Sequence, residues 1–441
     1  MHTLEQLRSG ALAGVRRLDL ACGLTELPAE IFALADTLEV LNISGNRLSD
    51  LPHQLPRLHR LQVLFASDND FCVLPEVLGD CHGLQVVGFK ANHIAQVPPK
   101  ALPPALRWLI LTDNALGTLP EALGQRPALQ KLMLAGNQLQ TLPESLQAAQ
   151  QLELLRISAN RLSGVPQWLS ELPRLSWLAL AGNAMGWTFS ATPDLPGVPW
   201  SNVQLGALLG EGASGHIHRI QATGWDQALA LKLFKGAVTS DGLPADELAA
   251  CLAAGQHTAL TTPVATLTGH PTQAQGLLMP LIPAGHVNLA GPPSLQTCTR
   301  DVYPSGFGLS DSLALQIACD VADAVAHLHQ RGVMHGDLYA HNILMDPALG
   351  EARLGDFGAA TQLPANQADM CQPLLALEVR AFGCLLEELA AVVPSPSPSP
   401  SPAGRALHAL AQACLCLAPS ERPVMAEVRR QCQSLATGVC R

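Results

Sequence analysis

Leucines recur at a fixed spacing through the first 185 residues of the chain. From Leu38 onward the pattern L-x-x-L-x-L-x-x-N-x-L returns, with its asparagines 23, 23, 22, 23, 23 and 23 residues apart at Asn46, Asn69, Asn92, Asn114, Asn137, Asn160 and Asn183. A shorter copy around Leu18, Leu20 and Leu24 precedes them and has Cys22 in place of the asparagine. A fixed period of roughly 20–29 residues predicts a stack of short repeated units rather than one globular core.

Each copy of the pattern predicts one short strand followed by a turn. A single repeat cannot bury its inward-facing leucines alone, so neighbouring repeats stack into a curved solenoid. The asparagine follows the strand, and its amide can bond backbone groups that the turn leaves without partners. The pattern resembles the leucine-rich repeat. The resemblance implies an α/β solenoid of about eight repeats over residues 1–185.

The variable positions beside each central leucine are where such a solenoid is expected to bind. One column of these positions is apolar and contains Phe65, Trp108, Met133 and Trp177. An exposed apolar column predicts a protein partner or a contact with another part of the same chain. Ordinary variability in an apolar-rich repeat is the competing interpretation, and the sequence favours neither.

A glycine-rich motif opens the second half of the chain, after a strand-like stretch at residues 203–205. It has the form G-x-G-x-x-G, with glycines at Gly210, Gly212 and Gly215 and the β-branched Ile217 after them. Glycines allow backbone amides to approach phosphates closely. Dinucleotide-binding folds share this motif, but no strand-to-helix unit with an acidic residue about 20 positions later follows here.

A lysine strand follows the glycine-rich motif. Residues 228–232 match the V-A-I-K strand of protein kinases, and Ala230 shares a strand face with Lys232. The chain has five lysines, and only Lys232 and Lys235 lie in this half, so a lysine at this position is hard to attribute to chance. An Ala/Leu-rich helix over residues 245–252 carries Glu247 as the expected partner of Lys232, with Asp246 as the competing choice.

The most specific motif spans residues 333–344. It matches H-R-D-L-x-x-x-N at every position except Gly336, which replaces the arginine, and Asp356-Phe357-Gly358 follows it. Motif order, spacing and residue types together make residues 203–441 resemble a eukaryotic-type protein kinase domain. The resemblance implies an α+β bilobal fold with an N-lobe over residues 203–282, a C-lobe over 283–441 and a Ser-Pro insertion at 394–402.

The resemblance also implies a role for each matching residue, with ATP and Mg²⁺ as cofactors. Asp337 would accept the substrate hydroxyl proton, Asn342 and Asp356 would hold Mg²⁺, and Lys232 with the glycine-rich loop would position the phosphates. His335 would pack against Phe357 in a structural role. Met279 would be the gatekeeper before a hinge at residues 280–282. The nucleotide would lie among Ile217, Ala230, Met279, Leu281 and Leu344.

Four departures from the kinase pattern stand out. Gly336 removes the arginine that pairs with a phosphorylated activation loop, which argues against that form of control. Tyr339 stands where serine/threonine kinases have a lysine. The stretch after Asp356 is short and lacks an A-P-E motif, and only residues 365–367 lie near the position expected for that motif. Residues 378–383 then resemble the D-x-W-S-F-G start of the following helix, with Glu378 in place of the aspartate. Arg422, which usually pairs with the missing glutamate, therefore has no expected partner.

Composition narrows the class of protein. The chain has 441 residues, of which 48% are hydrophobic and 14% charged, and this balance excludes a disordered chain. A net charge of −10 argues against nucleic-acid binding. We expect no secretory signal and no membrane span, since the Pro-rich residues 186–202 predict only a cap and linker. Twelve cysteines without a paired framework predict buried thiols in the cytoplasm.

These features together predict a cytoplasmic protein kinase that phosphorylates Ser/Thr hydroxyls, with a repeat domain that recruits or regulates. A catalytically weak scaffold that acts through the repeats is one alternative, and a kinase of a small molecule is another. The sequence does not name the substrate, the partner of the repeats or the activating signal.

Overall fold

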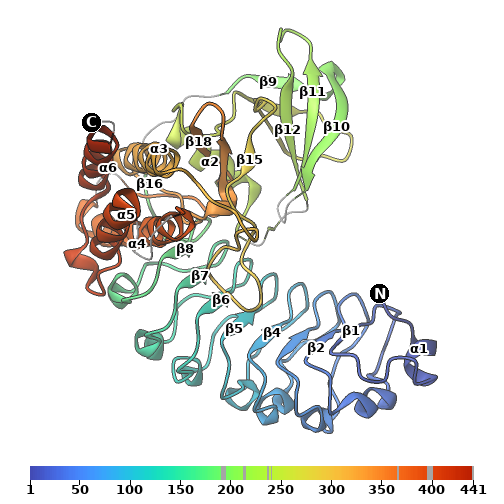
Figure 1. The fold of residues 1–441 in the computed structure, drawn as a ribbon. Coiled ribbons are helices and arrows are strands. Elements are labelled where there is room, and N and C mark those ends of the chain that lie inside the picture. The colour runs from blue at the N-terminus through green and yellow to red at the C-terminus, as the bar shows by residue number, and fades with distance from the viewer. Residues whose placement is uncertain are drawn as a thin grey trace. The chain divides into compact units, whose positions relative to one another are not determined.

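The computed structural model describes residues 1–189, 195–211, 215–235, 238–239, 241–364, 367–394 and 401–439. The chain forms two compact units, which Figure 1 traces from blue to red. The first contains Met1–Leu172 and Asn183–Met185, and the second contains Pro173–Gly182 and Gly186–Arg441. No helix in the described ranges has the length and apolar character needed to cross a membrane.

Short parallel strands, one from each repeat, form a single sheet of eight. They are β1 (Arg17–Asp19), β2 (Val40–Asn42), β3 (Val63–Phe65), β4 (Val86–Gly88), β5 (Trp108–Ile110), β6 (Lys131–Met133), β7 (Leu154–Arg156) and β8 (Trp177–Ala179). The register places equivalent residues side by side, so Leu41 pairs with Leu18 and Leu64. The three central leucines are fully buried. The predicted α/β solenoid is therefore confirmed.

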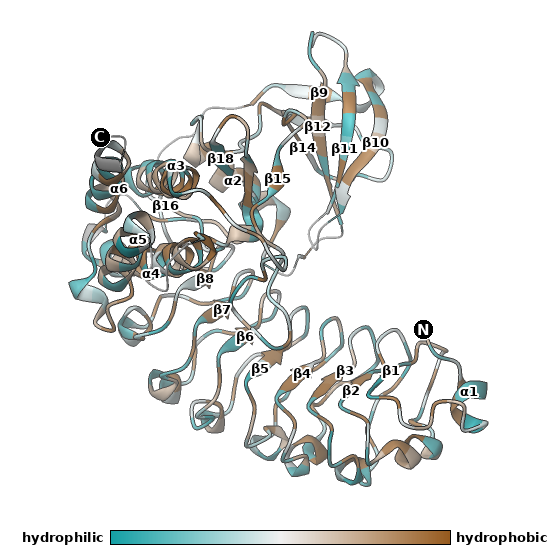
Figure 2. Ribbon diagram, viewed as in Figure 1, coloured by the Kyte–Doolittle hydropathy of each residue, from teal (hydrophilic) through white to brown (hydrophobic). Residues whose placement is uncertain are grey.

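The opposite side of each repeat is a short 3₁₀ helix that begins after a proline in most copies. These helices are η1 (Ala29–Leu34), η2 (Leu55–Arg57), η3 (Glu76–Asp80), η4 (Pro99–Ala101), η5 (Glu121–Leu123), η6 (Glu144–Ala148) and η7 (Gln167–Glu171). The α-helix α1 (Leu4–Arg8) precedes them and is capped by Thr3, whose side chain accepts a hydrogen bond from the Gln6 amide. Figure 2 shows apolar colour along the strands of this unit.

The repeated asparagines bond the backbone inside the solenoid. Asn69 Oδ1 accepts from the Leu48 amide at 2.9 Å, and Asn69 Nδ2 donates to the Ile43 carbonyl at 3.0 Å. Asn137 makes the same contacts three repeats later, with the Leu116 amide and the Leu111 carbonyl. Each amide thus joins two repeats and satisfies buried backbone groups, as the sequence predicts.

The N-terminal lobe of the second unit is a six-stranded sheet in the order β10-β11-β12-β14-β13-β9. Its strands are β9 (Gly197–Pro199), β10 (Val203–Glu211), β11 (Gly215–Ala222), β12 (Leu229–Phe234), β13 (Ala265–Thr268) and β14 (Gly276–Pro280), and α2 (Pro244–Ala254) joins β12 to β13. The predicted linker at residues 186–202 thus contains a strand, β9, which pairs parallel to β13. It also contains η8 (Trp200–Asn202), and its residues 190–194 lie outside the described ranges.

The C-terminal lobe is mainly helical and has an apolar centre. Its helices are α3 (Asp311–Gln330), α4 (Ala368–Val392), α5 (Pro402–Cys414) and α6 (Met425–Val439), with η9 (Ala340–Asn342) and η10 (Pro419–Glu421). Two small sheets flank α3, formed by β15 (Val287–Asn288), β17 (Ile343–Asp346) and β18 (Glu351–Leu354), and by β16 (Val333–Met334) and β19 (Thr361–Gln362). Of the predicted Ser-Pro insertion, residues 395–400 lie outside the described part of the chain.

Candidate active site

A buried ion pair joins the sheet of the N-terminal lobe to its helix. Lys232 extends from β12, and its Nζ lies 2.7 Å from Glu247 Oε1 on α2. Both side chains are almost fully buried. The structure therefore pairs Lys232 with Glu247 rather than with Asp246. Lys232 Nζ also lies 3.4 Å from Asp356 Oδ1, which brings the lysine strand and the D-F-G motif together across 124 residues of sequence.

Charge and burial act against each other in this cluster. Burial alone would lower the pKa of Lys232, but the negative charges of Asp356 and Glu247 outweigh it and raise that pKa. Burial raises the pKa of Glu247 to about 7, although Lys232 opposes the rise. Burial would also raise the pKa of Asp356, but the neighbouring Lys232 lowers it. Lys232 is therefore a fixed positive charge beside an ionised Asp356.

The catalytic-loop motif is a compact turn between β16 and β17. Asn342 Nδ2 donates to the Asp337 backbone carbonyl at 2.9 Å and to Asp337 Oδ2 at 2.8 Å. These two bonds fix the Asp337 carboxylate relative to Asn342. The His335 ring lies 5.1 Å from the Phe357 ring, and His335 Nε2 lies 3.0 Å from the Gly355 carbonyl oxygen. The structural position expected for His335 is therefore confirmed.

Glu378 holds the same loop from α4. Its Oε1 accepts from the Gly336 amide at 2.7 Å, and its Oε2 lies 2.8 Å from His329 Nε2. Burial would raise the pKa of Glu378, but the hydrogen bonds from His329 and Gly336 lower it. Glu378 lies within α4 and not at the helix start that the sequence predicts, because α4 begins at Ala368. The residue that replaces the usual aspartate is therefore an ionised anchor of the loop.

The two described glycines of the glycine-rich motif differ in what surrounds them. A Cβ on Gly210 would have no neighbour within 4 Å, so this position is open. A Cβ on Gly215 would lie 2.4 Å from the Leu233 backbone oxygen of β12. Gly215 is thus required by strand packing as well as suited to phosphates, which the motif alone did not indicate. Gly212, also predicted to line the site, lies outside the described residues.

The residues expected around a nucleotide base come from adjacent strands. Ala230 of β12 pairs in register with Met279 of β14, and Gly210 of β10 pairs with Ile217 of β11. Leu281 follows β14 and is partly buried, and Leu344 lies on β17 opposite Arg353. The sheet therefore brings Ala230 and Met279 together, next to the strand position of Lys232.

The side chains at this site fit ATP and Mg²⁺. Lys232 supplies a cation, Asp356 a carboxylate and Asn342 an amide oxygen, and Mg²⁺ prefers oxygen ligands. The described residues contain no group of three or more His, Cys, Asp or Glu side chains that could hold a metal alone. Mg²⁺ characteristically binds through one or two carboxylates together with substrate phosphates, so a two-residue set is sufficient.

Three features of the site were not expected from the sequence, and all involve the segment Pro173–Gly182. Arg422 donates to backbone carbonyl oxygens, from Nη2 to Pro173 at 2.8 Å and from Nη1 to Ala376 at 2.9 Å. A Cβ on Gly336 would lie 2.5 Å from the Leu178 carbonyl oxygen. Trp177 is 1% exposed, with its ring stacked on Tyr339. Nothing in a repeat pattern signals contacts this distant in sequence.

Trp177 is not exposed, and of the two roles predicted for the apolar column it has the contact with another part of the same chain. Trp177 cannot contribute to a partner-binding surface because the Tyr339 ring covers it. Phe65, Trp108 and Met133 are partly exposed. Lys131 Nζ lies 4.2 Å from the centroid of the Trp108 ring, a cation–π contact.

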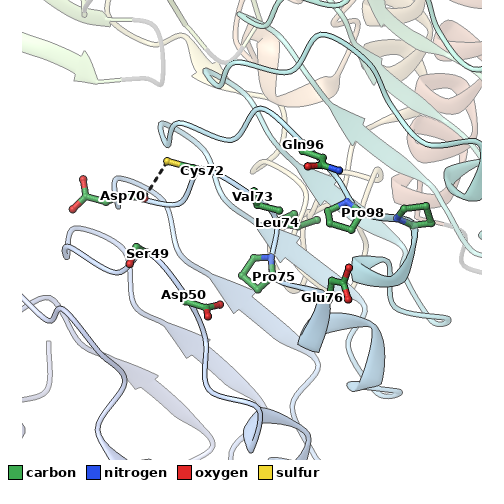
Figure 3. Close-up of a pocket in the computed structure, with 11 residues that line it drawn as sticks. Ser49, Asp50, Asp70, Cys72, Val73, Leu74, Pro75, Glu76, Gln96 and Pro98 are labelled. Carbon is green, nitrogen blue, oxygen red and sulfur yellow. Dashed lines mark hydrogen bonds between the residues drawn. The ribbon is translucent and has the colours of Figure 1, made fainter.

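A pocket of about 600 Å³ opens on the first unit, at the turns between repeats. Figure 3 shows its lining, which includes Asp50, Asp70, Leu74 and Glu76. The lining contains three carboxylates and no basic side chain, so it does not suit a phosphate. The pocket also lies apart from the column of Phe65, Trp108 and Met133, because none of these residues lines it.

Comparison with protein families supports both halves of the chain. The family model described as "Protein kinase domain" matches residues 203–375. Two models described as leucine-rich repeats match residues 127–185 and 37–58.

Curated relatives match over short stretches. The serine/threonine-protein kinase AtPK1/AtPK6 of Arabidopsis thaliana is 42% identical over 65 residues, which is 15% of this chain and 14% of the relative. The serine/threonine-protein kinase PrkC of Bacillus subtilis is 44% identical over 53 residues, covering 12% of this chain and 8% of the relative. The Aurora/IPL1-related protein kinase 2 of Caenorhabditis elegans is 33% identical over 63 residues, or 14% of this chain and 20% of the relative. The chain thus spans a fifth or less of the length of these relatives. With the repeated strands, the Lys232 cluster and the catalytic loop, these matches show that the chain combines leucine-rich repeats with a protein kinase domain.

Proposed function

We propose that this protein is an ATP- and Mg²⁺-dependent protein kinase that phosphorylates Ser or Thr hydroxyls. The observation that carries the proposal is the cluster of Lys232, Glu247 and Asp356, with distances of 2.7 and 3.4 Å at Lys232 Nζ. These residues come from β12, α2 and the D-F-G motif, which are distant from one another along the chain. The serine/threonine kinases among the relatives support the choice of hydroxyl.

The residues divide the work of phosphoryl transfer. ATP supplies the γ-phosphoryl group, with Mg²⁺ as its counter-charge. Lys232 holds the phosphates, and Glu247 keeps Lys232 in place. Asn342 and Asp356 hold Mg²⁺. Asp337 orients the substrate hydroxyl and accepts its proton, and its carboxylate is held for this by Asn342 at 2.8 Å. Catalysis rests on positioning and charge neutralisation.

The experiment compares the purified chain with an Asp337→Asn variant, using γ-labelled ATP and a general protein substrate rich in Ser and Thr. We expect label on the substrate or on the chain itself, and its loss in Asp337→Asn. An Asp226→Asn variant is the matched control, because Asp226 is an exposed aspartate in the turn between β11 and β12. Label on phosphoserine or phosphothreonine supports the assigned hydroxyl class. Absence of label from every protein would contradict the proposal.

A nucleotide-binding scaffold is the second candidate function. The observation that favours it is Tyr339, which is buried and stacked on Trp177 where a kinase lysine would be solvated near the γ-phosphate. Nine residues separate Gly358 from α4, which leaves a small platform for a peptide, and of these residues 365 and 366 lie outside the described ranges. A rise in melting temperature with ATP and Mg²⁺ but no transferred label would support the scaffold. Label on a small hydroxyl compound but on no protein would instead support a small-molecule kinase.

We also propose that the repeats bind a protein partner through Phe65, Trp108 and Met133, and that the protein works in the reducing cytoplasm. The partly exposed side chains of this column support the partner. Cys81 and Cys414 support the compartment, because both are buried as thiols and burial raises the pKa of each to about 12. A pull-down that compares the wild-type chain with a Phe65→Ser, Trp108→Ser double variant tests whether a protein partner binds this column.

A further inference from the structure

The segment Pro173–Gly182 contains strand β8 of the repeats, yet it packs as part of the second unit. Its central residues are no more than 2% exposed, a degree of burial shared by Ser176, Trp177, Leu178, Ala179 and Leu180. A repeat whose strand faced solvent would keep part of these side chains accessible. The segment is therefore a buried element of the kinase domain, although it lies outside residues 203–441 that resemble a kinase.

Three contacts join this segment to the residues on either side of Asp337. Trp177 Nε1 donates to the Leu338 carbonyl at 2.9 Å. The Trp177 ring stacks on Tyr339, with centroids 4.3 Å apart and planes 6° apart. On the other side of Asp337, the backbone of Gly336 approaches the Leu178 carbonyl so closely that a Cβ would lie 2.5 Å from it.

The same segment contacts Thr361, which lies within the short connection after the D-F-G motif, and Arg422. The Leu180 amide donates to Thr361 Oγ1 of β19 at 3.4 Å. The Pro173 carbonyl accepts from Arg422 Nη2 at 2.8 Å, and Arg422 also donates to the Ala376 carbonyl of α4. The segment thus bonds to one of the nine residues between Gly358 and α4, and to an arginine that also bonds α4.

We infer that Trp177 is a positioning residue for the catalytic loop, and that Pro173–Gly182 supports this loop in place of a longer connection after the D-F-G motif. The inference rests on the proposed function, since the loop it holds carries Asp337. A hydrogen bond to Leu338 and a stacked Tyr339 fix the two residues that follow Asp337. Asn342 holds Asp337 itself, through bonds to its backbone carbonyl and its carboxylate. Removal of Trp177 frees the Asp337 backbone to shift, and a misplacement of about 1 Å at a reacting group can cost about 100-fold in rate.

The test uses the full chain with Trp177→Phe and Trp177→Leu. Trp177→Phe keeps a ring against Tyr339 and loses the bond to Leu338, whereas Trp177→Leu loses both. Trp168→Phe is the matched control, because Trp168 is a buried tryptophan of η7 in the first unit whose Nε1 has no hydrogen-bond partner. Phosphate transfer is measured against ATP concentration, and hydrogen exchange is followed in peptides covering residues 336–342.

We expect kcat to fall about 10-fold in Trp177→Phe and about 100-fold in Trp177→Leu, with KM for ATP within about 2-fold of the wild type. Exchange in residues 336–342 should be faster in both variants and unchanged in Trp168→Phe. A loss caused by general unfolding would instead raise exchange throughout α3. If Trp177→Leu does not fold, Trp177→Phe alone decides.

Two results would overturn the inference. One is wild-type kcat in Trp177→Phe and Trp177→Leu. The other is unchanged exchange in residues 336–342 of Trp177→Phe. The exchange measurement needs no enzymatic activity, so it remains decisive if the wild-type chain transfers no phosphate. Failure of the proposed function and failure of this inference are therefore separate results.

Discussion

Substitution of Gly336 by alanine tests whether the segment Pro173–Gly182 lies against the catalytic loop. Gly336 has a φ of +73°, and a Cβ there would lie 2.5 Å from the Leu178 carbonyl oxygen and 2.7 Å from that of Ala359. Both neighbours are backbone atoms, so neither can rotate away. The family arginine at this position would meet the same two oxygens with a larger side chain. We therefore expect Gly336→Arg to destabilise the protein rather than restore a kinase feature.

The cost of Gly336→Ala has two parts. A left-handed backbone conformation costs a residue with a Cβ about 1–2 kcal/mol. Forcing an added methyl into a packed site costs about 1–3 kcal/mol. The free energy of unfolding of the second unit should therefore fall by about 2–5 kcal/mol. Gly350→Ala separates the two parts, because Gly350 has a φ of +72° and an added Cβ would meet nothing within 4 Å. Its cost should be the backbone part alone, about 1–2 kcal/mol.

The assay is hydrogen exchange of the α3 amides, which are buried in the second unit and report its global opening. A loss of about 2–5 kcal/mol should speed this exchange by about 30-fold to several thousand-fold, at about 1.4 kcal/mol for each factor of ten. The control variant should show a smaller increase. If Gly336→Ala proves no more destabilising than Gly350→Ala, Leu178 does not press against the catalytic loop. The account of the segment would then be wrong.

Three further predictions concern the ion pair, the solenoid and Arg422. Because the pKa of Glu247 is about 7, Glu247 gains a proton as pH falls through 7 and releases Lys232, so kcat should fall with it. The Glu247→Gln variant should be slow at every pH and should not show this fall in kcat below pH 7. The raised pKa also means that the native state binds the extra proton, so this group's contribution to stability declines as pH rises from about 4.5 to about 7, measurable by urea unfolding across that range. Asn137→Ala should destabilise the solenoid by about 2–4 kcal/mol in urea unfolding, because it leaves the buried backbone groups that Asn137 bonds without partners. Gln138 is exposed, so Gln138→Ala should change the free energy of unfolding little. Arg422→Lys should cost about 2–4 kcal/mol by exchange in α3, since one ammonium cannot reach three separate carbonyls; a value near zero would show that these bonds contribute nothing.

Much of the candidate site could be predicted from the sequence because its motifs are local. The pairing of Lys232 with a residue of the next helix follows from motif order, and the choice of Glu247 over Asp246 required the helix to be placed. The sequence explains Gly215 by phosphate binding alone, because the approach of the Leu233 carbonyl oxygen depends on the pairing of β11 with β12. Strand pairing decides which backbone atoms meet, and a motif does not contain that information.

The sequence could not choose between the two roles predicted for Trp177, for a related reason. Its position in the repeat is one that normally faces solvent, so the repeat pattern predicts exposure. Its partners Leu338 and Tyr339 lie more than 160 residues away, in a motif with a separate explanation. By the kinase pattern alone, Gly336 lacks the expected arginine and Tyr339 lacks the expected lysine. In the structure one makes room for Leu178 and the other provides the surface on which Trp177 stacks.

The sequence by itself determined the two kinds of module, the number of strands in the solenoid and the order of the kinase motifs. The repeats recur every 22 or 23 residues and each kinase motif is a short local stretch, so periodicity and spacing record them. Only the tertiary structure decided that β8 belongs with the kinase domain, why residue 336 must be glycine and which groups Arg422 binds. Those outcomes depend on close packing between segments that are distant along the chain, where a single carbonyl oxygen can exclude a methyl group.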